Sequence, residues 1–423
     1  MYSITPSGTR VYLGGEFNMV GWVARGNLAA LDVRTGRVTS WNPGANGEVF
    51  ALASYANSIY VGGTFTSIGG TLRNRIAALH SVTGLATSWY PNANGEVYAL
   101  VTDGTTVYAG GTFTACGGAT RNRIAALNTA TGAATAWNPN GNGAVLSLAL
   151  HDTTLYAGGS FTTIGGQSRA RIAALNTGSG GATNWNPNAN ADVLALCARE
   201  SSVFAGGAFT SIGGATRNRI AALSPSTGLA QNWNPDADAT VRALATVQSN
   251  VVAGGDFTSL GAQARNRLAS IDESTGAVTS WNPNASAPVE ALAVTANLVF
   301  AGGSFQTVGG LPQYGIVGLG GGVTDVPRAP EPPSAPLALL QQNHPNPFRD
   351  QTTLGFSLPV ATYVTLKVYD VAGREVASLM NREFRAAGNH TLSFADRSLP
   401  NGVYLVRLVA GRSVATRKMT RLQ

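Results

Sequence analysis

The stretch VYAGGTFTACGGATRNRIAALNTATGAATAWNP, residues 107–139, decides the fold of this chain. Its Gly-Gly doublet is followed two residues later by Phe, and this pattern returns every 48 residues without an insertion or deletion. A fixed period of roughly 20–50 residues indicates a repeat architecture, because each unit buries its apolar face against the next. The seven doublets begin at Gly14, Gly62, Gly110, Gly158, Gly206, Gly254 and Gly302.

Two further series keep the same 48-residue spacing. One is a tryptophan in each of the first six units, and the other is an Arg-x-Arg segment that precedes an apolar run in five units. The tryptophans are Trp41, Trp89, Trp137, Trp185, Trp233 and Trp281. Three independent series in one register indicate seven copies of a single unit.

The unit at residues 49–96 predicts four short strands. We expect them at Val49–Ala53, Ser58–Phe65, Arg75–His80 and Ala86–Tyr90. The segments between them are turn formers, because glycine supplies positive φ and asparagine bonds its own backbone. Four strands per unit in seven units predict an all-β fold, a seven-bladed (six to eight) β-propeller of 48-residue four-stranded blades. A linear β-solenoid is the alternative.

Composition agrees with a closed β architecture. Of the 423 residues 44% are apolar and 12% charged, and the 52 glycines have no three-residue period, which excludes disordered and collagen-like classes. The net charge of +7 comes mainly from residues 344–423, with 11 Lys and Arg against 5 Asp and Glu, so the repeats predict no nucleic-acid partner. No stretch approaches the ~18 apolar residues of a transmembrane segment. Cys116 and Cys197 fall at different repeat positions and predict neither a disulfide nor a metal pair.

The quoted stretch also carries a family resemblance. RIAALNTATGAATAWNP (residues 123–139) and VYAGGTFTACGGATRNRIAAL (residues 107–127) resemble the delta-60-type propeller repeats of large bacterial surface proteins. The Ala-Leu-x-x-x-Thr-Gly-x-x-x-x-Trp portion is similar to the tryptophan-docking motif of quinoprotein dehydrogenases. That resemblance implies that each tryptophan packs against the neighbouring blade. An aromatic platform for glycans is the alternative reading of the series.

The seventh unit differs from the others because no Trp-Asn-Pro segment follows Ile316–Leu319. Propellers commonly close when an N-terminal strand completes the last blade. We therefore expect the native chain to extend upstream of Met1 by a strand resembling ATSWNP and by a signal peptide.

Composition changes abruptly after the last unit. The run Pro327–Pro336 holds five prolines and favours an extended, semi-rigid spacer. We therefore expect a propeller at residues 1–322, a Pro-rich linker at 323–340 and a second domain at 341–423.

The second domain predicts an immunoglobulin-like β-sandwich. Period-two apolar stretches separated by Ala-Gly and Asn-Gly pairs indicate antiparallel hairpins, with about seven short strands in all. The expected strands are Thr353–Leu358, Tyr363–Tyr369, Arg374–Leu379, His390–Phe394, Val403–Val409 and Ser413–Lys418.

Several motifs give this tail its own resemblance. NHPNPF, LKVYDVAGREVASL, AGNHTLSF, LPNGVYLVRL and the late RKM resemble the C-terminal sorting domain of the type IX secretion system. A similar immunoglobulin-like module occurs in flagellar hook-capping proteins. The resemblance implies that the type IX machinery is a partner, and that the protein is placed on the outer cell surface or released outside the cell.

No catalytic motif emerges from the repeats. Their acidic residues are scattered, although Glu48, Glu96 and Asp192 share one repeat position, while His80 and His151 are isolated. We therefore expect a non-catalytic binding, adhesion or display module with a glycan or protein ligand. The alternative is an extracellular polysaccharide-active or quinoprotein-like enzyme. No cofactor is predicted, although the oxygen-rich loops at 186–192 and 234–238 could hold Ca²⁺ or could simply be asparagine turns.

The Arg-x-Arg pairs are the candidate binding site. Residues two apart on a strand point to one face, so we expect each pair to project together and the ring to repeat it along one rim. The rim could hold an acidic polysaccharide, or the guanidinium groups could bond the carbonyls of the Gly-Gly and Asn-rich loops. Arg25 and Asn27 replace the pair in the first unit, and Gln313 and Gly315 in the seventh. The candidate residues are Arg73, Arg75, Arg121, Arg123, Arg169, Arg171, Arg217, Arg219, Arg265 and Arg267.

Overall fold

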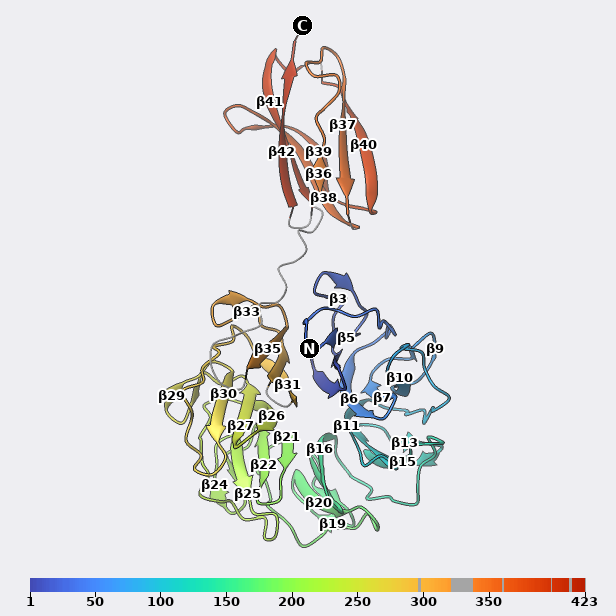
Figure 1. Ribbon diagram of the computed structural model, residues 1–423, viewed down its shortest axis with the longest axis vertical. Coiled ribbons are helices and arrows are strands. Elements are labelled where there is room, and N and C mark those ends of the chain that lie inside the picture. The colour runs from blue at the N-terminus through green and yellow to red at the C-terminus, as the bar shows by residue number, and fades with distance from the viewer. Residues whose placement is uncertain (296–297, 321–337, 360, 397, 411–412, 423) are drawn as a thin grey trace. The chain divides into compact units, whose positions relative to one another are not determined.

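The structure is a computed structural model, and its described residues form strands, turns and loops without a helix, which confirms the all-β prediction. The chain divides into two compact units, Met1–Pro330 and Glu331–Gln423 (Figure 1). Most of the linker expected at 323–340, including Pro327–Pro336, lies outside the described residues. The described residues are 1–295, 298–320, 338–359, 361–396, 398–410 and 413–422.

The first unit is a ring of three-stranded antiparallel sheets around a central channel (Figure 1). Its described residues form seven such sheets, and the first strand of each contacts the first strand of the next. β1 (Ser3–Ser7) also contacts β31 (Val289–Thr295), so the ring is closed. A closed ring needs no capping repeats, and the linear solenoid alternative is therefore wrong.

Each sheet runs outward from the channel in chain order. The other innermost strands are β6 (Val49–Tyr55), β11 (Val97–Thr102), β16 (Val145–His151), β21 (Val193–Ala198) and β26 (Val241–Val247). The middle strands are β2 (Arg10–Gly14), β7 (Ser58–Gly63), β12 (Thr106–Gly111), β17 (Thr154–Gly159), β22 (Val203–Gly207), β27 (Asn250–Gly255) and β32 (Leu298–Gly303). The outer strands are β5 (Leu28–Asp32), β10 (Ile76–His80), β15 (Ile124–Asn128), β20 (Ile172–Asn176), β25 (Ile220–Leu223), β30 (Leu268–Asp272) and β35 (Ile316–Gly320).

A two-residue hairpin separates the middle and outer strands of every blade. In five blades its turn is a second Gly-Gly, as at Gly117 and Gly118, which both have positive φ, whereas the first blade has Gly21-Trp22 and the sixth Gly261-Ala262 there. The hairpins are β3 (Met19–Val20) with β4 (Val23–Ala24), β8 (Ser67–Ile68) with β9 (Thr71–Leu72), β13 (Ala115–Cys116) with β14 (Ala119–Thr120), β18 (Thr163–Ile164) with β19 (Gln167–Ser168), β23 (Ser211–Ile212) with β24 (Ala215–Thr216), β28 (Ser259–Leu260) with β29 (Gln263–Ala264), and β33 (Thr307–Val308) with β34 (Leu311–Pro312).

The expected fourth strand is much shorter than predicted. In the second blade, the segment at 86–90 pairs with β10 through one isolated bridge between Leu79 and Ala86. The amide of Thr87 still donates to the carbonyl of Ala78, and the chain then leaves the sheet edge. It leaves because Trp89 inserts between this blade and the next, where its side chain is 3% exposed.

The first glycine of each Gly-Gly doublet allows neighbouring blades to approach. A Cβ on Gly110 would lie 2.6 Å from a methyl carbon of Val145, the first residue of the next blade. The same contact joins the other blades, and at the closing seam the side chain of Met1 replaces the valine, 2.8 Å from a Cβ on Gly302. Because such distances are shorter than packed atoms tolerate, any larger residue would separate the blades.

The second unit is a sandwich of two antiparallel sheets, with strand orders β36-β37-β40 and β39-β38-β41-β42. Its core includes Phe356 of one sheet and Leu366 of the other, and Tyr404 donates its hydroxyl to the Pro400 carbonyl. The tail sheets begin at Leu339, before the expected boundary at 341. Its strands are β36 (Leu339–Leu340), β37 (Thr352–Leu358), β38 (Thr362–Asp370), β39 (Glu375–Arg385), β40 (Gly388–Phe394), β41 (Gly402–Ala410) and β42 (Ser413–Arg421).

Candidate functional site

The strongest candidate site is a cavity of about 240 Å³ in the central channel, which we call the cup. All seven innermost strands contribute to it. One ring of side chains comes from the second residue of each repeat, and a second ring comes from two residues further along. The first ring is Tyr2, Phe50, Tyr98, Leu146, Leu194, Arg242 and Glu290; the second is Ile4, Leu52, Leu100, Leu148, Leu196, Leu244 and Leu292.

A β-bulge places the first ring. In the third blade, Val97 pairs with Gly111 and Ala99 with Gly110, so Tyr98 is the extra residue between them. The register shifts at the same position from the second blade through the seventh. A bulge leaves one residue without a partner on the neighbouring strand and redirects its side chain. The side chain at this position can therefore line the channel without disturbing the pairing of the strands.

The first ring of the cup is one of the places where the repeats differ. The valine that begins each innermost strand is constant from Val49 to Val289, whereas the next position carries aromatic, aliphatic, cationic and acidic residues. The position before that valine varies in the same way, from Glu48 and Glu96 to Pro288. Packing requirements are the same in every blade, so packing does not account for this variation.

Three blades give the cup an aromatic arc. The ring centroids of Tyr2 and Phe50 are 5.6 Å apart, and those of Phe50 and Tyr98 are 5.2 Å apart, both pairs tilted. The hydroxyl of Tyr2 donates to Glu16 over 3.3 Å, and that of Tyr98 donates to Glu96. Burial and this carboxylate raise the pKa of Tyr98 to about 12, so its hydroxyl stays protonated.

The same side of the cup carries three carboxylates. Glu48 lies close enough to Glu16 and Glu96 that, after burial, their negative charges raise the pKa of its carboxyl. Among the described residues, no Lys or Arg side chain forms an ion pair with Glu16, Glu48 or Glu96. This part of the opening is therefore acidic, and a positive charge beside it is the largely buried amino group of Met1, which interacts with Glu16.

The opposite side is balanced by an ion network. Arg242 forms two hydrogen bonds of 2.8 Å with Asp256 of its own blade and lies 3.6 Å from Glu290 of the next. Burial raises the pKa of Glu290, and the Arg242 charge opposes that shift. The guanidinium is thus already engaged, and the cup as a whole is acidic.

The structure corrects the expected geometry of the Arg-x-Arg pairs. Arg73 and Arg75 do not lie on a strand but in the loop between β9 and β10. The second arginine has positive φ, 61° at Arg75 and 68° at Arg123, which breaks the strand alternation on which the prediction relied. The two side chains of a pair therefore do not share one strand face.

Both arginines bond main-chain carbonyls. Arg73 donates to Leu72 over 2.8 Å and to Thr87 over 2.6 Å, and Arg75 donates to Ala93 over 3.3 Å. Arg169, Arg217 and Arg265 repeat the first arrangement, and Arg171, Arg219 and Arg267 the second. Arg121 follows the first pattern with Thr120 and Thr135, while Arg123 bonds Thr112 and Phe113.

The first blade gives an internal comparison for these contacts. Arg25 donates to Thr39 over 2.6 Å, at the position equivalent to the bond from Arg73 to Thr87. Asn27 replaces the second arginine and donates its amide to Ala45 over 3.0 Å. Since a neutral amide makes the bond there, the contact does not require a positive charge.

The oxygen-rich loops bond within the protein. Asn190 accepts the amides of Thr210 and Ser211, and Asp238 accepts those of Thr258 and Ser259. His80 likewise accepts amides of its own turn, from Val82 and Thr83. Among the described residues no group of three His, Cys, Asp or Glu is arranged to hold a metal ion. Asn190 and Asp238 therefore tie their loops to segments 20 and 21 residues further along the chain.

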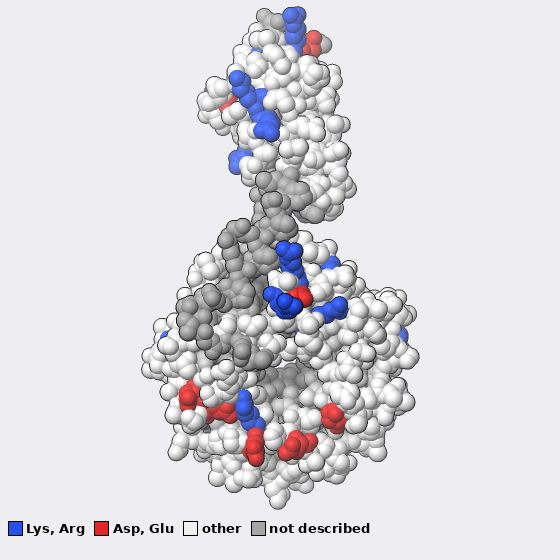
Figure 2. Space-filling model, viewed as in Figure 1, with Lys and Arg blue, Asp and Glu red and all other residues white. Residues whose placement is uncertain are grey.

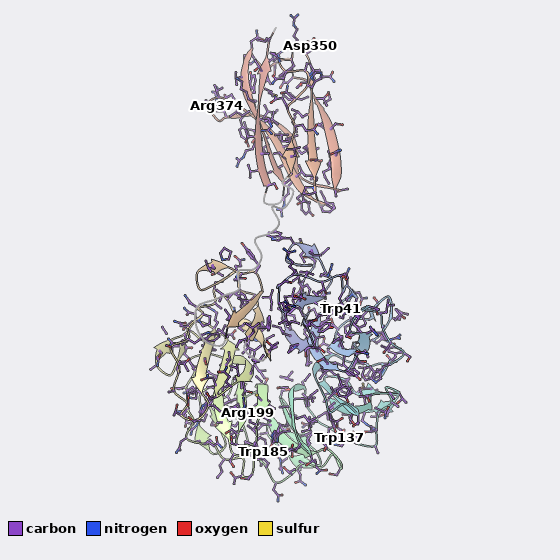
Figure 3. All side chains as sticks on the ribbon, viewed as in Figure 1. Trp41, Trp137, Trp185, Arg199, Asp350 and Arg374 are labelled. Atoms are coloured by element: carbon purple, nitrogen blue, oxygen red, sulfur yellow. The ribbon has the colours of Figure 1, made fainter. Side chains whose placement is uncertain are left out.

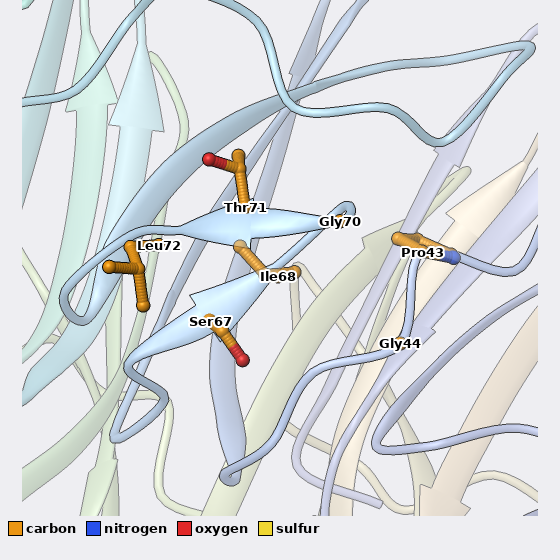
Figure 4. Close-up of a pocket in the computed structure, with 7 residues that line it drawn as sticks. All are labelled: Pro43, Gly44, Ser67, Ile68, Gly70, Thr71 and Leu72. Carbon is orange, nitrogen blue, oxygen red and sulfur yellow. The ribbon is translucent and has the colours of Figure 1, made fainter.

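A second, larger pocket has little chemistry. It is an open hollow of about 570 Å³ between the Pro43–Gly44 turn and the hairpin at Ser67–Leu72 (Figure 4). Its polar side chains are the hydroxyls of Ser67 and Thr71. The opposite charges of the cup are absent from this lining.

Tryptophans stabilise the ring and do not form a surface platform. Figure 3 shows Trp41, Trp137 and Trp185 spread around the ring, and each is at most 5% exposed. On the face drawn in Figure 2, many charged side chains of the propeller gather in two groups, one mostly acidic and one mostly basic, with a wide uncharged area between them.

Comparison with known families adds two matches. Residues 343–420 match the family described as a secretion system C-terminal sorting domain. Residues 57–81 match a beta-propeller domain of unknown function, DUF5122. A comparison with curated proteins finds no match.

Solved structures include similar chains at low identity. The computationally designed Ika8 protein is 17% identical, with 83% of this chain and 92% of that chain covered and a TM-score of 0.49. The computationally designed Ika4 protein is 18% identical, with 43% and 93% covered and a TM-score of 0.31. A glycoside hydrolase is 10% identical, with 98% and 94% covered and a TM-score of 0.29.

The fold and the matches define a β-propeller repeat protein that carries an export signal in its C-terminal domain. That domain is a type IX secretion sorting domain, as its motifs indicated, so the protein is directed to the cell surface or the extracellular space by the type IX machinery. Among the described residues, none belongs to a helix long and apolar enough to cross a membrane.

Proposed function

We propose that this exported propeller is a non-catalytic binding module whose ligand occupies the cup. The observation that carries the proposal is the variation of the bulge position, which changes from Tyr98 to Leu146 to Arg242 while the surrounding framework stays constant. A concave site with a few polar groups and shifted pKa values is the usual form of a ligand site.

A non-catalytic role is supported by how the polar groups of the cup are engaged. Tyr98 and Arg242 both have carboxylate partners, and the described residues of the cup include no histidine or cysteine. Burial and Glu96 raise the pKa of Tyr98 to about 12, so its hydroxyl stays protonated and is not poised to act as a nucleophile. The acidic groups suit recognition of a ligand by charge and hydrogen bonding.

The repeats supply matched variants for a test. Tyr98→Leu with Glu96→Ala gives the third blade the residues that the fourth has at Leu146 and Ala144, so the variant should fold. The purified full chain and this variant are exposed to a glycan array and to a peptide library. We expect the parent to retain a ligand unchanged and the variant to lose it.

Two results would contradict the proposal. Ligands held equally by both proteins would place binding outside the cup. Chemical conversion of a retained ligand by the parent, lost in the variant, would make the cup an active site. Melting curves of both proteins confirm that they are equally folded.

A further inference from the structure

The chemistry of the cup points to a particular class of ligand, and this inference rests on the function proposed above. We propose that the cup binds an alkylammonium group, carried by a free quaternary ammonium compound or by a lysine side chain. The features that define the site are the aromatic arc of Tyr2, Phe50 and Tyr98 and the cluster of Glu16, Glu48 and Glu96 beside it, in which no Lys or Arg of the described residues forms an ion pair.

Charge complementarity selects a cation. Glu16, Glu48 and Glu96 repel one another, and Arg242 on the opposite side is already held by Asp256. An anionic or neutral ligand would leave this repulsion in place, whereas a cation would relieve it. An acidic polysaccharide is therefore disfavoured here.

The aromatic arc selects an organic cation over a metal ion. Cations are attracted to the faces of Tyr and Phe rings, and aromatic side chains form the cages that bind quaternary ammonium groups. A metal ion would instead need several carboxylates converging on one point. Among the described residues, the carboxylates do not converge in that way.

The remaining walls select a ligand with a hydrocarbon portion. Leu146 and Leu194 continue the first ring beyond the aromatic arc. The second ring, from Ile4 to Leu292, adds further apolar side chains. The volume of about 240 Å³ is below the roughly 300–1,000 Å³ of sites for drug-sized molecules. A small ammonium group on a short alkyl chain suits both the size and the apolar surface.

Calorimetric titration of the full chain tests the charge directly. The probes are choline and its neutral isostere 3,3-dimethylbutan-1-ol, which has the same shape without the positive charge. We expect choline to bind about tenfold or more tightly than the isostere, because the ring faces and the carboxylates act on the charge. Nα-acetyl-lysine N-methylamide and its Nε-trimethyl form, as second probes, distinguish a lysine side chain from a free compound.

Variants then locate the binding. Glu96→Ala and Tyr98→Leu should each weaken choline binding several-fold, and both copy residues that the next blade already has at Ala144 and Leu146. The exposed Glu200→Gln is the control for a lost charge elsewhere and should change nothing. Equal binding of the isostere, no binding of any cation at millimolar concentration, or full binding by both cup variants would overturn the inference. Neutral sugars bound in the cup would also overturn it, while leaving the proposed binding function intact.

Discussion

The indole nitrogen of Trp137 donates a 2.9 Å hydrogen bond to the carbonyl oxygen of Asn176, which ends the outer strand of the following blade. The ring of Trp137 also meets Tyr108 of its own blade edge-on, with centroids 5.3 Å apart. Trp41, Trp89, Trp185 and Trp233 make the same bond at their own boundaries. One side chain thus packs within its blade and bonds the next, as the docking resemblance implied.

Trp137→Ala should lower the free energy of unfolding by about 3–5 kcal/mol, because it opens a cavity between two blades. Trp137→Phe keeps most of the ring and loses the hydrogen bond, and should cost less. Chemical denaturation of the full chain measures both. A loss of less than about 1 kcal/mol for the alanine variant would mean that the ring is not packed as described.

Gly111→Ala should destabilise the propeller more than Gly118→Ala. A Cβ at Gly111 would collide with the carbonyl oxygen of Glu96, whereas a Cβ at Gly118 meets nothing within 4 Å. Gly118 still has a φ of 77°, so alanine there is strained by roughly 1–2 kcal/mol. Denaturation midpoints of the two variants give the order, and equal losses would show that the close approach at Gly111 is relieved by movement.

Replacing Arg121 and Arg123 by Gln should reduce stability without changing glycan binding. Both guanidinium groups bond main-chain carbonyls, and the shorter Gln side chain, with two N–H donors in place of five, cannot keep all of these bonds. Each lost bond should cost on the order of 1 kcal/mol. Binding to an acidic polysaccharide is measured at low and high salt in both proteins. Salt-sensitive binding by the parent that disappears at unchanged stability would instead favour the cationic rim.

Glu48→Gln should raise the melting temperature at pH 7. Burial and the charges of Glu16 and Glu96 raise the pKa of Glu48, so the folded state binds this proton more tightly than the unfolded state does. Stability from this group is therefore present at low pH and lost as the pH rises through the raised pKa. Melting curves at pH 4 and pH 7 test this, and the gain should be absent at pH 4. A lower melting temperature at pH 7 would contradict it.

Deleting residues 338–423 should leave the propeller folded and stop its export. The sorting domain lies wholly in the deleted part, and each unit has its own hydrophobic core. Fractionation of cells that express the parent and the truncated chain gives the answer, with circular dichroism as the control for folding. Truncated protein outside the cell in normal amounts would show that another segment directs export.

Most of the fold was predictable because the same residues recur for the same physical reason. The Gly-Gly doublets mark where blades approach, and the expected strand at Ser58–Phe65 corresponds to Ser58–Gly63. The fourth strand was overestimated, because the apolar spacing at 86–90 serves Trp89 and not a ladder. Alternating apolar residues do not distinguish a β-strand from an irregular segment that places a single tryptophan side chain between two blades.

The cup was missed for the opposite reason. Residues that recur in each repeat, such as Arg121 and Arg123, are easy to recognise in the sequence. Tyr98 is replaced by different residue types in most other blades, so it does not belong to a recurring series. Glu48, Glu96 and Asp192 share a repeat position two residues before the bulge residue, but this pattern alone does not reveal a cavity. Aligning the seven repeats and looking for the positions that vary would identify the bulge residues. The bulge itself, which directs their side chains into the channel, has no sequence signature.

The contact between Gly110 and Val145 has a consequence for how such a ring changes over time. The same glycine and valine meet at each boundary from Gly14–Val49 to Gly254–Val289, so the interface does not identify which two blades it joins. Recombination between two 48-residue units would add or remove a whole blade and leave every remaining boundary chemically unaltered. What such an event would change is the circumference of the channel and the order of residues around it. A duplication could thus alter ligand choice in one step without a single new packing interaction having to evolve.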